Sequence, residues 1–219
     1  MRRYALTVLG ALMAGGSFGW AVITWRQTRG VKAAIQPATD GTSQVTGSPA
    51  LYSAASAPTG VWPPRSLMLI AFKQERRLEV WGDGLLLRSY PILAASGTAG
   101  PKRREGDRQV PEGIYRLTTL NPQSQFHLSI RVDYPDAEDR STGCTGCDIY
   151  LHGGAVSIGC IAVGDTAIEE IYGLASRVAN RWIMIVPWDL RRRPAPTAQE
   201  PWLAERYRKL DASLRALGR

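Results

Sequence analysis

Residues 148–165 read D-I-Y-L-H-G-G-A-V-S-I-G-C-I-A-V-G-D, and the rest of the chain is organised around this stretch. Alternating apolar residues lead into His152, which predicts a strand that ends at the imidazole. Two glycines follow at once, where a backbone turns sharply or leaves room for a ligand. Cys160 comes six residues after the second glycine, so a histidine and a thiol are close in the sequence.

A cysteine close to a histidine is typical of nucleophilic catalysis. The thiolate is the attacking form, and a neighbouring imidazole lowers the thiol pKa and accepts its proton. Gly159 directly precedes the thiol, where a missing side chain lets a substrate carbonyl approach and, with Ser157, leaves backbone N–H groups for an oxyanion hole. This pattern predicts acyl transfer. A buried structural cysteine beside a satisfied strand histidine is the alternative interpretation.

Three segments resemble a known family: H-G-G-A-V-S-I-G-C-I-A-V at 152–163, E-G-D-R-Q-V-P-E-G-I-Y at 105–115 and Y-P-D-A-E-D-R at 134–140. They resemble the L,D-transpeptidase catalytic domain of YkuD type, and in particular its YafK-like branch, over about residues 66–187. The resemblance implies a YkuD-like mixed β-sandwich that acts on peptidoglycan stem peptides. By position, Cys160 is similar to the family nucleophile and His152 to its base. The N–H groups around Gly159 and Cys160 match the oxyanion hole, and a carbonyl near Gly153 matches the group that orients the histidine.

Two positions depart from the common signature of that family. Ile158 stands where the signature has His, and Ala162 stands where it has Arg. Both changes remove a polar side chain beside the thiol. They cast doubt on ordinary cross-linking more than on the thiol chemistry, because the branch this sequence resembles includes an amidase that cuts lipoprotein from murein.

The composition predicts one globular domain with extensions, since 219 residues with 44% apolar content can bury a sizeable core. Apolar or alternating runs predict a mainly β (α+β) domain at 66–188, with strands at 67–72, 78–81, 85–92, 114–120, 125–134, 148–152 and 182–186. One packed helix is expected after the cysteine, with Ile168, Ile171, Tyr172, Ala175 and Val178 at helical spacing. Asp165 or Thr166 would cap it, with Glu169 closing a capping box.

Residues 1–26 predict a signal anchor. Tyr4 to Trp25 carry no charge over 22 residues, a length that spans a bilayer, and no small-residue cleavage site follows. Residues 27–65 are rich in Ala, Thr, Ser, Gly and Pro and are typical of a flexible linker. With the family resemblance, this predicts a single-pass inner-membrane protein whose catalytic domain lies in the periplasm.

The basic residues gather at the two ends of the chain. The net charge is +8, yet residues 33–188 carry 14 positive and 15 negative charges. This distribution argues against a nucleic-acid partner and favours anionic lipid or wall polymer, or simply solvated termini. In the basic tail at 189–219, Leu203, Tyr207, Leu210, Leu214 and Leu217 share one face, which predicts an amphipathic C-terminal helix.

Cys144-Thr145-Gly146-Cys147 is a C-x-x-C motif with three physical interpretations: a redox pair, half of a zinc site, or a small disulfide. Redox chemistry is disfavoured because the motif precedes a strand. Zinc would need Cys160 and His152 as further ligands, without the usual spacing. We therefore expect no metal and no cofactor. In an oxidising compartment, three cysteines pair as a Cys144–Cys147 disulfide plus one free thiol.

Two further features lie outside the central stretch. The loop 97–113 carries Lys102, Arg103, Arg104, Glu105, Asp107 and Arg108. Under the resemblance this loop borders the active-site cleft, where its cations could meet stem-peptide carboxylates. His127 is the second histidine, on an apparent strand, and we expect no catalytic role for it.

The sequence thus predicts a cysteine enzyme of peptidoglycan metabolism. Cys160 would attack the amide on the L-centre of diaminopimelate and form a thioester, which water or an amine resolves. Hydrolysis is favoured; the alternatives are a transpeptidase that forms cross-links or lipoprotein attachments, and, in another class, a non-catalytic wall-binding module. The expected partners are stem peptides, a murein-linked lipoprotein and the membrane.

Overall fold

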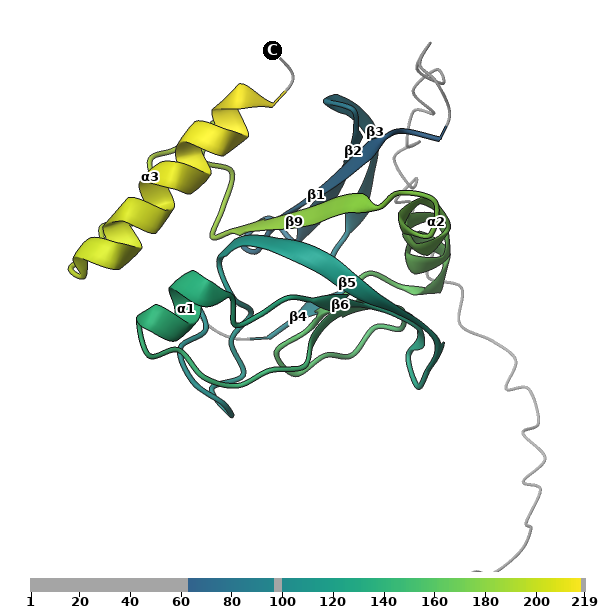
Figure 1. Cartoon of the computed structure of the whole chain (residues 1–219), viewed down its shortest axis with the longest axis horizontal. Helices are drawn as coiled ribbons and strands as arrows, with labels where there is room; N and C mark the ends of the chain where they lie inside the picture. The colour runs from purple at the N-terminus through teal and green to yellow at the C-terminus, as the bar shows by residue number, and fades with distance from the viewer. Residues whose placement is uncertain (1–62, 97–99, 218–219) are drawn as a thin grey trace, which may run out of the picture. The chain divides into compact units, whose positions relative to one another are not determined.

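The computed structural model describes residues 63–96 and 100–217 (Figure 1). Within these ranges the strands are β1 (Ser66–Phe72), β2 (Arg77–Gly82), β3 (Leu85–Pro91), β4 (Ala94–Ala95), β5 (Gly113–Ser124), β6 (His127–Val132), β7 (Ile149–His152), β8 (Ile161–Ala162) and β9 (Asn180–Val186). The helices are α1 (Ala137–Ser141), α2 (Asp165–Ala175) and α3 (Pro201–Ala216). The mainly β prediction is confirmed.

The described strands form one nine-stranded sheet in the order β3-β2-β1-β9-β5-β6-β7-β8-β4. The two layers of the expected sandwich are therefore two halves of one continuous sheet. Strand β5 joins them, because its first residues pair with β9 and its later residues pair with β6. The β5–β6 register shifts between Leu117 and Leu120, and such an irregularity bends a strand and increases its twist.

One core lies between the two halves of the curled sheet. Leu67 and Leu69 of β1 contribute to it from one half, and Ile130 and Leu151 from the other. Helix α2 adds Ile168, Ile171 and Ala175, all at positions that the helical spacing predicted. Fully burying such an aliphatic side chain stabilises the fold by about 1.5–3 kcal/mol.

A second core lies on the outer face of the first half, under α3. Strand side chains alternate between faces, so Ile70 and Phe72 point away from the first core and contact this helix instead. Leu203, Tyr207, Leu210 and Leu214 are buried on the α3 side. Figure 1 shows α3 and α2 on different sides of the sheet.

The predicted side-chain cap of α2 is absent. The residue before the helix is Gly164, with φ 84° and no side-chain cap hydrogen bond. The carboxylate of Asp165 instead accepts a hydrogen bond from the Gly154 N–H at 2.7 Å. The Asp165 carboxylate, which the sequence predicted as the cap of α2, therefore holds the glycine turn after His152 instead.

The predicted anchor at 1–26 and nearly all of the predicted linker at 27–65 lie outside the described residues. No helix within 63–96 and 100–217 is both long enough and apolar enough to cross a membrane.

Candidate active site

Cys160 lies immediately before β8, next to β7. The parallel pairing aligns Leu151 with Ile161 and His152 with Ala162. Leu151 and Ile161 point into the core, so the residues that alternate with them point to the outer face of the sheet. The half-buried Cys160 thiol donates to Asp148 O at 3.5 Å and receives a hydrogen bond from the Tyr150 N–H. The nucleophile candidate is therefore held against the beginning of β7.

His152 ends β7 on that same outer face and is only 2% exposed. Its Nδ1 lies 2.6 Å from Gly153 O. Because a carbonyl only accepts, Nδ1 carries the proton and Nε2 of the neutral ring is an acceptor. The ring of Phe126 covers the imidazole, with the ring centroids 4.6 Å apart. The imidazole thus has a fixed tautomer and a fixed orientation.

Cys160, just before β8, and His152, at the end of the adjacent β7, are not hydrogen-bonded to each other. Between these two described side chains there is no such contact, and the register separates them by two positions along the strand. Catalytic hydrogen bonds are often long without substrate and tighten only when it binds. The arrangement is compatible with proton transfer once the thiol turns toward Nε2.

Both groups favour their neutral forms. Burial raises the pKa of the Cys160 thiol, and the Asp148 carboxylate raises it further, against the hydrogen bond from Tyr150. Burial lowers the pKa of His152, against its hydrogen bond to Gly153. The resting pair is a thiol and a neutral imidazole, so proton transfer would accompany nucleophilic attack.

Serine hydroxyls occupy the backbone donors of the predicted oxyanion hole. The Cys160 N–H donates to Ser157 Oγ at 3.0 Å, and the Gly159 N–H donates to Ser96 Oγ. Ser96 in turn donates to Arg108 O at 2.8 Å. A substrate oxygen would have to replace these hydroxyls. Sequence spacing gave no signal for Ser96, because it comes from the end of β4.

The turn after His152 admits no side chain. A Cβ on Gly153 would lie 2.6 Å from Asp165 Oδ1 and 2.7 Å from Phe126 O, closer than real contacts allow. Gly154 has φ 69°, a region that glycine reaches without strain. These two glycines let the α2 carboxylate and the Phe126 carbonyl approach the histidine's own loop.

The predicted Cys144–Cys147 disulfide is not formed in the structure, where all three cysteines are free. Cys144 is buried in the first core, whereas Cys147 is exposed and its thiol donates to Asp148 Oδ2 at 3.2 Å. The two side chains of the motif thus have different surroundings. Across 63–96 and 100–217, no three His, Cys, Asp or Glu side chains cluster as a metal site.

The charged loop is folded around Asp107. The carboxylate accepts hydrogen bonds from Lys102 Nζ at 2.7 Å and from three backbone N–H groups, those of Arg103, Arg104 and Gln109. Burial alone would raise the pKa of Asp107, but these donors hold it well below its usual range. The Gln109 carbonyl lies 3.7 Å from the position that a Cβ on Gly159 would occupy, so this loop borders the nucleophile segment.

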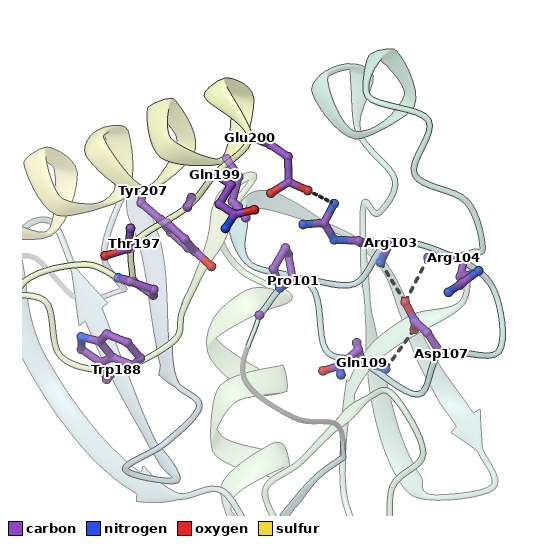
Figure 2. A pocket seen from close by; sticks show the side chains of 14 residues that line it. Pro101, Arg103, Arg104, Asp107, Gln109, Trp188, Thr197, Gln199, Glu200 and Tyr207 are labelled. Carbon is purple, nitrogen blue, oxygen red and sulfur yellow. Dashed lines mark hydrogen bonds and ion pairs between the residues drawn. The ribbon is translucent and has the colours of Figure 1, made fainter.

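A cavity of about 590 Å³ lies between this loop, α3 and the segment before α3 (Figure 2). Its walls include Arg104, Trp188 and Tyr207. Arg103 Nη1 pairs with Glu200 Oε1 at 2.7 Å and joins the loop to the start of the helix. Neither Cys160 nor His152 lines this cavity.

His127 lies away from the thiol. It begins β6, and its Nε2 pairs with Glu169 Oε1 of α2 at 2.6 Å, with the histidine side chain 42% exposed. It therefore links the sheet to α2 at the surface.

A thiol and a carbonyl-held imidazole on one sheet face are the elements of a cysteine acyl-transfer site. The family model of the L,D-transpeptidase catalytic domain (YkuD) matches residues 66–186, more than half of the chain, and the chain belongs to this family. Its similarity to YafK of Escherichia coli (strain K12), provisionally named an L,D-transpeptidase, is 41% identity over 107 residues. That match covers 46% of this chain and 44% of YafK, so it spans less than half of the relative.

Among solved structures, the chain is similar to the helical cell shape determining protein Pgp2 from Campylobacter jejuni. The TM-score is 0.50 at 24% identity, covering 57% of this chain and 49% of Pgp2. The K307A mutant of Pgp2 also gives a TM-score of 0.50, at 20% identity, covering 74% of this chain and 58% of that one. These likenesses concern the fold alone.

Proposed function

We propose that this chain is a cysteine enzyme of peptidoglycan metabolism that acts on the L-centre amide of diaminopimelate in stem peptides. The observation that carries the proposal is the placement of Cys160, immediately before β8, beside β7, which ends at His152, with His152 Nδ1 held by Gly153 O. Membership of the L,D-transpeptidase family supports the substrate class.

The proposed mechanism begins with proton transfer from the Cys160 thiol to His152 Nε2 as sulfur attacks the amide carbon. The developing oxyanion replaces the serine hydroxyls on the Gly159 and Cys160 N–H groups. The C–N bond then breaks, and the departing amine takes the proton from the imidazolium. A thioester on Cys160 remains. Water or a second amine, deprotonated by His152, attacks the thioester and releases the thiol.

Hydrolysis is our proposal for the second step. A transpeptidase has to orient an acceptor amine so that it outcompetes water, which takes polar contacts near the nucleophile. Ile158 is 76% exposed beside Cys160 and offers no such contact, and Ala162 is fully buried in the pairing with β4. The alternative is an L,D-transpeptidase that forms cross-links or attaches lipoprotein. A non-catalytic wall-binding module is the alternative from another class.

Turnover by Cys160→Ala, compared with Cys147→Ala, tests this function. The substrates are a tetrapeptide muropeptide dimer and a lipoprotein-linked muropeptide, each with an excess of free acceptor. Cys160→Ala should lower turnover by about a thousandfold or more, because no covalent intermediate can form, and Cys147→Ala should retain it. A thioester adduct on the wild-type protein should be visible by mass spectrometry.

The products separate the alternatives. Cleavage products without cross-linked products are expected. Cross-linked product without simple cleavage would replace the hydrolase with the transpeptidase. Full turnover by Cys160→Ala would remove the nucleophile assignment, and binding of murein without any turnover would favour the wall-binding module.

We further propose that residues 1–26 anchor the protein in the inner membrane with the catalytic domain in the periplasm. The uncharged stretch from Tyr4 to Trp25 supports this proposal. The full chain should sediment with membranes and a chain that starts at residue 27 should not. Recovery of both in the same fraction would contradict the anchor.

A further inference from the structure

Two oppositely charged side chains lie on the catalytic face beside Cys160. Arg131 of β6 pairs with Tyr150 of β7, and the Tyr150 N–H in turn bonds to the Cys160 thiol. Asp148 directly precedes β7, and its backbone carbonyl accepts from the same thiol at 3.5 Å. Since neighbouring strands lie about 4.8 Å apart, Arg131 starts about 10 Å from the nucleophile, across a single strand.

The side chains of Arg131 and Asp148 form only a long ion pair with each other. Arg131 Nη2 lies 4.0 Å from Asp148 Oδ1, with the side chains 42% and 66% exposed. Arg131 Nε is buried and has no hydrogen-bond partner among the described residues. The other polar contacts of the carboxylate come from neutral donors, the Tyr150 hydroxyl at 3.4 Å and the Cys147 thiol at 3.2 Å.

Two exposed ion pairs within α3 have shorter distances between their charged atoms than the Arg131–Asp148 pair. Arg208 Nη2 lies 2.6 Å from Glu205 Oε1, and Arg215 Nε lies 2.8 Å from Asp211 Oδ1. Unlike these pairs, Arg131 and Asp148 place an exposed guanidinium and an exposed carboxylate side by side without a close contact between them. Each of two such charged groups can form a charge-assisted hydrogen bond with an oppositely charged group of a ligand.

We infer that Arg131 and Asp148 form a subsite for an α-amino-acid zwitterion next to the nucleophile. Arg131 binds the ligand's carboxylate and Asp148 binds its ammonium group, with the partly buried Tyr150 as a neighbour of both. Resting on the proposed function, the ligand is the free D-centre of diaminopimelate. This centre is joined to the attacked L-centre by a short methylene chain, so Cys160 and the subsite would hold the two ends of one residue.

If the subsite exists, the effect of each substitution should depend on whether the peptide carries the charged group that the substituted residue binds. Four stem peptides serve as probes: intact, amidated at the D-centre carboxylate, acetylated at the D-centre amine, and with lysine in place of diaminopimelate. For the intact peptide, Arg131→Gln and Asp148→Asn in the full chain should each lower kcat/KM by roughly ten- to hundredfold.

On the altered peptides the effects should differ. Arg131→Gln should have little further effect on kcat/KM for the amidated and lysine peptides, and Asp148→Asn should have little further effect on kcat/KM for the acetylated peptide. Arg208→Gln and Glu205→Gln are matched controls that should change none of these values.

Binding to the full chain carrying Cys160→Ala provides a readout that is independent of chemistry. Its affinity for the intact peptide should exceed that for the other three. Equal affinities, or losses in Arg131→Gln and Asp148→Asn that are the same for every peptide, would overturn the subsite. Failure of the wild-type protein to turn over any stem peptide would overturn the proposed function instead, and binding would still decide the subsite.

Discussion

The chemistry of the candidate nucleophile is set by burial at the residue scale. A thiolate–imidazolium pair would require a lowered thiol pKa, but burial first and the Asp148 carboxylate next raise the pKa of Cys160. Burial also lowers the pKa of His152. The structure therefore favours a base-assisted thiol over a preformed ion pair, and this distinction can be measured as a pH dependence.

Alkylation by iodoacetamide should report the raised thiol pKa. Only the thiolate reacts, so the rate at Cys160 should rise with pH and reach its midpoint above the usual cysteine value of about 8.5. Asp148→Asn removes a negative charge, which lowers both thiol pKa values and shifts both midpoints to lower pH. The shift should be larger at Cys147, where the hydrogen bond to Asp148 is the first cause of the raised pKa, than at Cys160, where burial is.

Peptide mass spectrometry resolves the two rates. A Cys160 midpoint below the usual value would contradict the neutral pair and would indicate an imidazolium partner.

Sequence reasoning could identify the residues that are close along the chain. His152, Gly153 and Cys160 occur within one stretch whose chemistry is readable from residue types. Sequence reasoning could not identify Ser96, Phe126 and Arg131 as site residues. Ser96 follows β4, Phe126 lies in the β5–β6 turn and Arg131 lies in β6, so their roles depend on the sheet order. Arg131 was placed on the correct kind of element, but only the β6–β7 register sets it beside Tyr150.

At the element scale, periodicity predicted elements better than it predicted their ends. The spacing of apolar residues placed α2 after the cysteine, and Ile168, Ile171 and Ala175 are buried. The cap assignment was wrong because Asp165 has a competing donor, the Gly154 N–H, which is visible only after folding. For β5, the sequence predicted a regular strand at 114–120. Its extension to Gly113–Ser124, with a register shift, makes one sheet serve as two layers.

At the scale of the whole molecule, α3 extends the domain beyond the family match. The matched residues end at 186, yet β1 and β9 place Phe72 and Val186 under this helix. Tyr207 donates to Glu112 Oε2 at 2.7 Å, and Lys73 Nζ pairs with Glu112 Oε1 at 2.8 Å. The segment before β5 is therefore attached to both the sheet and the helix, and α3 supports the end of the loop that borders the candidate nucleophile.

The buried pair between α3 and α1 gives the last prediction. Arg206 and Asp139 are 4% and 0% exposed, and Arg206 Nη1 donates to Asp139 Oδ1 and to Glu112 O at 3.2 Å. Arg206→Ala leaves a carboxylate buried without its cation, which should lower the free energy of unfolding by about 3–5 kcal/mol. Arg208→Ala removes an exposed pair from the same helix and should cost less than about 1 kcal/mol.

A double variant separates lost charge compensation from lost packing. Asp139→Asn keeps a side chain able to accept at the start of α1 and carries no charge, so Arg206→Ala with Asp139→Asn, which leaves the same truncated side chain at 206, should recover part of the loss seen in Arg206→Ala. Urea denaturation followed by tryptophan fluorescence measures all four proteins. Equal stabilities for Arg206→Ala and Arg208→Ala would show that α3 is held by its apolar face alone. A double variant no more stable than Arg206→Ala would assign the loss to packing, because no charge would then remain unpaired.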